Sequence, residues 1–144
     1  MPLADHIDTT AAIAPAHHPW VCQTFARSAH EVDGGSEERK RDVRILLRVL
    51  RDPRARSTVA VPHGFPDDFL GWSLALDGAL VFAYVGYRHR RQGLGSYLMG
   101  KVTPDAGKPW RLAYWTRAAS RMALKGFPVT HDLDAYEALL QLDH

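Results

Sequence analysis

Residues 79–99 read ALVFAYVGYRHRRQGLGSYLM and contain the most specific pattern of the chain. Its first part, Ala79–Val85, is continuously apolar, which is the pattern of a strand buried on both faces. Gly93 and Gly95 then open a helix that we expect to end at Val102. Both glycines let the backbone approach a ligand closely and adopt a positive φ. The stretch therefore predicts a buried strand, a cationic turn and a short helix.

The turn itself is expected to bind a pyrophosphate. Successive N–H groups at a helix start, together with the positive end of the helix dipole, form a cradle for such an anion. Arg88, Arg90 and Arg91 add positive potential around it. Two common phosphate motifs fail here, because a dinucleotide fingerprint needs glycine at Leu98 and a phosphate loop needs Ser or Thr at Val102. A pyrophosphate site of a third kind is therefore expected.

The hexapeptide at residues 90–95, RRQGLG, matches the Arg/Gln-x-x-Gly-x-Gly/Ala signature of the GNAT superfamily of N-acetyltransferases. The chain resembles this family over residues 18–130. The resemblance implies acetyl-CoA as co-substrate, and it implies that the pyrophosphate is held by Arg90, Arg91, Gln92, Gly93, Leu94, Gly95 and Ser96.

The same resemblance implies an α/β (α+β) fold with a mixed, mostly antiparallel central sheet flanked by helices. Two strands, Ala79–Val85 and Leu112–Thr116, would separate to admit the pantetheine arm of CoA. Backbone groups near Ala83 and Val85 would bind that arm and polarise the thioester carbonyl.

The residues that would carry catalysis depart from the family pattern. The family often has a carboxylate base on the fourth strand, but Ala79–Val85 contains none, so Asp68 in the preceding loop is the candidate base. The family's tyrosine acid corresponds to Met122, and Tyr114 and Ser120 are the nearest substitutes. Other loop residues weighed as a base are Glu31, Asp33, His63 and Asp67.

The remaining segments fit a sheet covered by helices. Helices are expected at 18–31, 36–51, 117–125 and 132–142, and strands at 57–61, 69–77, 79–85, 110–116 and 127–130, with one short strand within 7–13. Asp77-Gly78 is a two-residue hairpin signal. Hairpin-linked strands early in the chain and helix-linked strands later imply a mixed α/β sheet.

The helix expected at 36–51 has two faces. Its core stripe is predicted to be Val43, Leu46, Leu47 and Leu50. A second stripe consists of Arg41, Arg44, Arg48 and Arg51, which form either a solvated face or a docking surface for an acidic partner.

Composition sets the protein class. The chain has 144 residues, and we expect a single domain over 1–144 with a loose leader at 1–17 and a C-terminal helical tail at 131–144. Hydrophobic residues at 46% and charged residues at 24% exclude disorder and collagen-like repeats.

A net charge of +2 does not require a nucleic-acid or membrane partner. The single Cys22 fits a reducing compartment, and a cytoplasmic location is expected. No metal is expected, because His17-His18 lacks further ligands at zinc spacing.

Two functions follow from the sequence. The first is an N-acyltransferase that moves an acetyl group from acetyl-CoA to a small-molecule or peptide amine by direct attack. The second is a catalytically inactive GNAT-fold protein with a structural or interaction role, for example virus-encoded. A homodimer or protein partner could bind through the C-terminal helix or the Arg41–Arg51 face.

Overall fold

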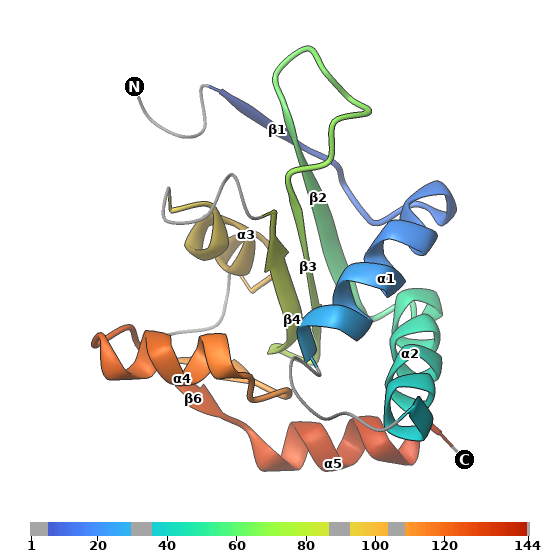
Figure 1. Cartoon of the computed structure of the whole chain (residues 1–144), viewed down its shortest axis with the longest axis vertical. Helices are drawn as coiled ribbons and strands as arrows, with labels where there is room; N and C mark the ends of the chain where they lie inside the picture. Colours follow the sequence, from blue (N-terminus) through green and yellow to red (C-terminus); the bar gives the residue numbers. More distant parts are fainter. Residues whose placement is uncertain (1–5, 30–35, 87–92, 104–108, 144) are drawn as a thin grey trace.

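The computed structural model describes residues 6–29, 36–86, 93–103 and 109–143 (Figure 1). Its helices are α1 (His18–Ala29), α2 (Ser36–Arg51), α3 (Leu94–Val102), α4 (Arg117–Leu124) and α5 (Leu133–Gln141), and a 3-10 helix, η2 (Pro15–His17), precedes α1. Its strands are β1 (Ile7–Thr9), β2 (Arg56–Pro62), β3 (Gly71–Leu76), β4 (Ala79–Val85), β5 (Trp110–Leu112) and β6 (Val129–His131). Every helix and strand expected from the sequence is present.

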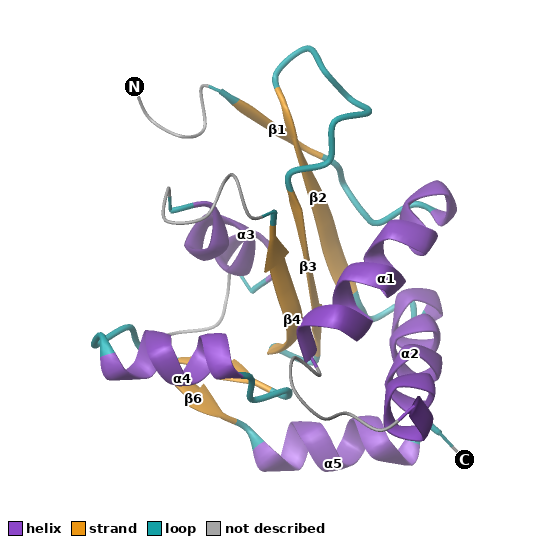
Figure 2. Cartoon of the chain, in the orientation of Figure 1, coloured by secondary structure: helices purple, strands orange, loops and turns teal. Residues whose placement is uncertain are grey.

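The described strands form one six-stranded sheet in the order β1-β2-β3-β4-β5-β6. The strands from β1 to β4 pair antiparallel, whereas β4 with β5 and β5 with β6 pair parallel. Parallel neighbours need a crossover connection, which α3 and α4 supply here, and Figure 2 shows both helices beside the sheet. The predicted mixed α/β fold, with a mostly antiparallel sheet flanked by helices, is confirmed.

The hairpin between β3 and β4 has the predicted turn. Asp77 and Gly78 have φ values of 51° and 80°, the left-handed pair that a two-residue turn requires. Further along, Leu74 pairs with Phe82 but Ala75 pairs with Leu80, so Val81 is an extra residue in β4. This β-bulge bends β4 just after its first residues.

Helices cover both faces of the sheet. Figure 1 shows α3 on one side of β3 and β4 and α1 with α2 on the other. On the α3 side, Gly71 allows close packing, because an added Cβ would lie only 3.0 Å from Leu98 Cδ1 of α3; it would also clash with the Tyr84 backbone oxygen of the paired strand β4. Ser73 Oγ donates to the Leu98 carbonyl across this contact at 2.9 Å. On the other side, Trp72 Nε1 donates to Thr24 Oγ1 of α1 at 2.8 Å. The main core fills this second side.

The predicted core stripe of α2 is rotated by one residue. Ile45, Leu46 and Val49 are fully buried, while Val43, Leu47 and Leu50 are half-buried. The fourth member of the buried face is Asp42, at 1% exposure. Because a carboxyl group sits in the apolar stripe, hydrophobic spacing alone could not locate that face.

Strand β5 is shorter than predicted. It ends at Leu112 rather than at Thr116, because the chain bends at residues 113–114 to begin α4; the Ala113 N–H still donates to the Leu80 carbonyl of β4 at 2.8 Å. Thr116 instead caps α4, its side chain accepting from the Ala119 N–H. The strand expected within 7–13 is β1, and Ile13 beyond it is buried, with its N–H donating to Ser57 Oγ at 2.8 Å.

Candidate active site

The two central parallel strands separate after a single contact. Leu80 pairs with Leu112, and the described residues show no pair beyond it between β4 and β5. From the bulge at Val81, β4 runs on to Val85 while the chain after Leu112 turns toward α4. A gap between the strands therefore opens at the carboxyl end of β4.

Backbone groups of β4 point into this gap. The Gly86 N–H donates to the Leu70 carbonyl on the β3 side at 2.8 Å. Because polar groups alternate along an antiparallel strand, those of Tyr84 also face β3, while those of Ala83 and Val85 face the gap. These are the two residues whose backbone groups the family resemblance expected to bind the pantetheine arm and the thioester carbonyl.

Apolar side chains pack on the α3 side of the sheet, around the paired residues Leu80 and Leu112. Ala83, Leu112 and Met122 are partly buried and pack against a cluster of buried side chains from β3, β4, α3 and β5. The cluster consists of Ala75, Leu80, Met99, Val102 and Trp110. Met122 is therefore a hydrophobic contact of this cluster, beside the paired part of β4 and β5.

The backbone at the start of α3 is not crowded by neighbouring side chains of the described residues. Its N-cap, Gly93, has φ 81°, a left-handed conformation that favours glycine. A Cβ at Gly93 would meet nothing within 4 Å, and one at Gly95 would meet only Val85 Cγ2 at 3.8 Å. Leu94 is buried and anchors the helix, while Ser96 is half-buried. The first-turn N–H groups of a helix have no partner within it, so this start can accept an anion.

The first half of the predicted cradle, Arg90, Arg91 and Gln92, lies outside the described residues, as do Glu31 and Asp33. The second half, from Gly93 to Ser96, is described and forms the start of α3.

Tyr114 is a core residue on the α1 and α2 side of the sheet. It is 7% exposed, and its ring packs edge-on against Phe25 at 5.3 Å. Its hydroxyl donates to Asp42 Oδ1 at 3.1 Å. Burial, and then the neighbouring Asp42, raise the pKa of Tyr114 well above its ordinary value. A proton held this way is poorly suited to protonating a thiolate.

Asp42 is a buried carboxyl group in the core that sequence reasoning did not identify. Besides Tyr114, it accepts from Arg41 Nε at 3.2 Å. The available signal was its position, since Asp42 falls in register with Ile45, Leu46 and Val49 on the apolar face of α2.

Ser120 is better placed to donate a proton. It is half-buried on α4, and its Oγ accepts from Trp115 Nε1 at 2.8 Å, which leaves the serine proton for another acceptor. Trp115 is 37% exposed and stacks on His131 with ring centroids 5.8 Å apart.

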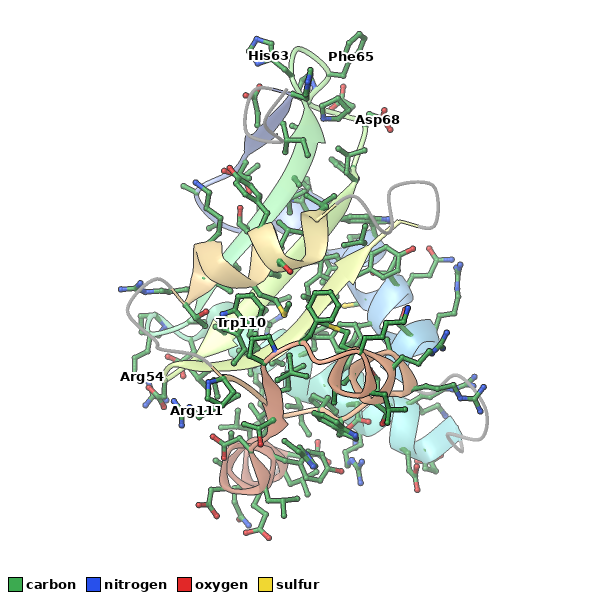
Figure 3. All side chains as sticks on the ribbon, turned by 90° about the vertical axis from the view of Figure 1, so that its left-hand side faces the viewer. Arg54, His63, Phe65, Asp68, Trp110 and Arg111 are labelled. Carbon is green, nitrogen blue, oxygen red and sulfur yellow. The ribbon has the colours of Figure 1, made fainter. Side chains whose placement is uncertain are left out.

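The structure does not bring Asp68 together with these residues. It lies exposed in the loop between β2 and β3, and Figure 3 shows it near Phe65 and His63, well away from Trp110. His63, another base considered, pairs with Asp8 at 3.1 Å. Asp67 is exposed in the same loop.

The described residues were also inspected for metal-ligand groups and for helices that could span a membrane. They contain no group of three or more His, Cys, Asp or Glu side chains arranged to hold a metal ion. In the same part of the chain, every helix is too short or too polar to span a bilayer.

Comparison with known proteins yields weak similarities. No family model and no curated protein matches the chain. Among solved structures, one similar chain is the aminoglycoside acetyltransferase meta-AAC0020 from an uncultured soil metagenomic sample, in complex with trehalose, at 15% identity and TM-score 0.40 over 96% of this chain and 90% of that one. Another is AAC(6')-Iy in complex with the bisubstrate analogue CoA-S-monomethyl-acetylneamine, at 12% identity and TM-score 0.40 over 93% of this chain and 89% of that one. At this level of identity and TM-score, neither similarity establishes what this chain does.

Proposed function

We propose that the chain is a GNAT-type N-acyltransferase that moves an acetyl group from acetyl-CoA to an amine. The observation that carries this proposal is the gap at the end of β4, which the backbone groups of Ala83 face. The start of α3, opened by the left-handed Gly93, follows it. Such a gap suits the extended pantetheine arm, and such a helix start suits the pyrophosphate.

The proposed reaction requires few catalytic side chains, because a backbone N–H can stabilise the oxyanion. The neutral amine attacks the acetyl carbonyl carbon, and a backbone N–H of β4 stabilises the developing oxyanion. The carbon–sulfur bond then breaks, and the sulfur leaves with the electron pair. A thiol of this kind has a pKa of about 8.5, so the thiolate is a tolerable leaving group, and Ser120 or water can supply its proton. The proton lost by the amine passes to solvent.

Calorimetric titration with CoA tests the binding half of the proposal. We expect Gly95→Glu to weaken CoA binding by about tenfold or more, because it places a negative charge in the cradle. Gly95 has room for a Cβ, and an acid in the first helical turn is favourable. The melting temperature should therefore not fall.

Gly100→Glu is the matched control. It makes the same change in the same helix at a position where a Cβ meets nothing within 4 Å. Equal CoA affinity in the two variants would place the site elsewhere, and no binding by the wild-type protein would overturn the proposal.

A second candidate is an inactive GNAT-fold protein with a structural or interaction role. Two observations favour it: the Tyr114 hydroxyl is engaged by Asp42, and Met122 packs in an apolar cluster. CoA binding without thiol release, across polyamine, aminoglycoside and peptide acceptors, would support this candidate.

A further inference from the structure

Four aromatic side chains form a row on the α1 side of the sheet, hereafter the aromatic row: Tyr84, Trp20, Phe69 and His17. Trp20 contacts Tyr84 edge-on with ring centroids 6.0 Å apart. On its other side, Trp20 lies 5.1 Å from Phe69, which in turn lies 5.0 Å from His17. All four are half-buried. Each ring therefore contacts the next while keeping part of its surface accessible.

The aromatic row begins at the proposed reaction centre. Tyr84 lies between Ala83 and Val85, whose backbone groups face the gap. The side chains of Ala83 and Val85 pack on the α3 side, whereas that of Tyr84 packs with the core on the α1 side. The row thus leads from the thioester position outward along the face opposite the α3 cluster.

We infer that the aromatic row is the acceptor subsite and that it takes an arylalkylamine, a primary amine joined by a short alkyl chain to an aromatic ring. This inference rests on the proposed function. The amine would reach the gap beside Tyr84, and the aryl ring would pack on Trp20 and Phe69, since aromatic pairs gain beyond simple area burial.

The chemistry of the row disfavours a polyamine. A polyamine carries several positive charges along its length, and carboxylates would have to face them. The row contains only aromatic rings, whose faces can attract an ammonium group but carry no negative charge to pair with several. An arylalkylamine has one charge and one ring, which matches a row with the reaction centre at one end.

The test measures binding of 2-phenylethylamine and of spermidine by calorimetry at saturating CoA. We expect the wild-type protein to bind 2-phenylethylamine more tightly. Phe69→Leu should weaken that binding about two- to tenfold. Phe65→Leu is the matched control: it makes the same change four residues earlier in the same loop, at a side chain that is 66% exposed.

Two safeguards keep the outcome decisive. CoA affinity, measured on each variant, reports whether the protein has folded, and Trp20→Leu serves as a second disruption of the row. Equal effects of Phe69→Leu and Phe65→Leu, or tighter binding of spermidine, would overturn the inference while CoA binding upholds the proposed function. Failure of the wild-type protein to bind CoA would overturn both.

Discussion

Asp42 shows how one residue connects three elements. It comes from α2, accepts from Tyr114 in the turn after β5, and is paired with its neighbour Arg41. Tyr114 in turn packs edge-on against Tyr136 of α5 at 5.5 Å. A buried carboxyl group with these partners holds the turn after β5, and so one side of the gap, against the helices.

Removing this carboxyl group should destabilise the protein. Asp42→Leu leaves the buried Tyr114 hydroxyl without its acceptor, and we expect the free energy of unfolding to fall by about 1–3 kcal/mol. Chemical denaturation measures this change. Adding Tyr114→Phe to Asp42→Leu should recover part of the loss, because the stranded hydroxyl is then gone. Strictly additive losses would show that the two residues do not interact.

Substitutions of Met122 distinguish the proposed enzyme from the inactive protein, because the two candidates predict different effects on the reaction rate. For an enzyme, Met122→Tyr supplies a hydroxyl at the position where the resemblance to the GNAT superfamily places the acid, and a positioned acid can raise the rate about 10²-fold or more. Thiol release from acetyl-CoA measures turnover. Met122→Phe is the control, since it adds the ring without the hydroxyl. If both variants are silent and both melt below the wild-type protein, Met122 is only a packing residue.

Among the helices and strands, α2 has one buried apolar face and one face that carries arginines. One face buries Ile45, Leu46 and Val49 against the core. The other carries the arginine stripe, in which Arg44 forms a two-pronged contact with Asp143 at 2.8 and 3.0 Å. Arg44 is 54% exposed, and exposed pairs contribute little to stability. The stripe is therefore interpreted as a solvated face.

Changing the stripe tests this interpretation. The double variant Arg44→Gln/Arg51→Gln should melt close to the wild-type temperature and bind CoA with wild-type affinity. Thermal melts and calorimetry provide the two readings. Loss of an acidic partner or of DNA in a pull-down would instead identify a docking surface, and DNA binding would have to weaken steeply with salt.

At the scale of the whole molecule, much of the fold could be predicted because its signals are local. Continuous hydrophobicity identified β4 with its bounds, and Asp77-Gly78 identified the hairpin before it. The left-handed Gly126 marks the end of α4 as expected, and Asp132 caps α5. Each of these features depends on a few neighbouring residues, so periodicity and turn chemistry suffice to find it.

The candidate site was predictable only in part. The glycines that open α3 follow from the helix pattern near residues 93–102, whereas Ala83 and Val85 were expected only from the family resemblance. The surroundings of Tyr114, Met122 and Ser120 could not be predicted, because these residues lie on later segments whose orientation local patterns do not specify.

Local sequence patterns were enough to predict the kinds of element, their order and the glycines at the start of α3. The buried face of α2, the end of β5 and the alignment of the rings of Tyr84, Trp20, Phe69 and His17 became clear only from the packing of the whole chain. The physical reason is that elements form from local backbone preferences, whereas buried polar pairs such as Asp42 with Tyr114 depend on contacts between residues distant in the chain.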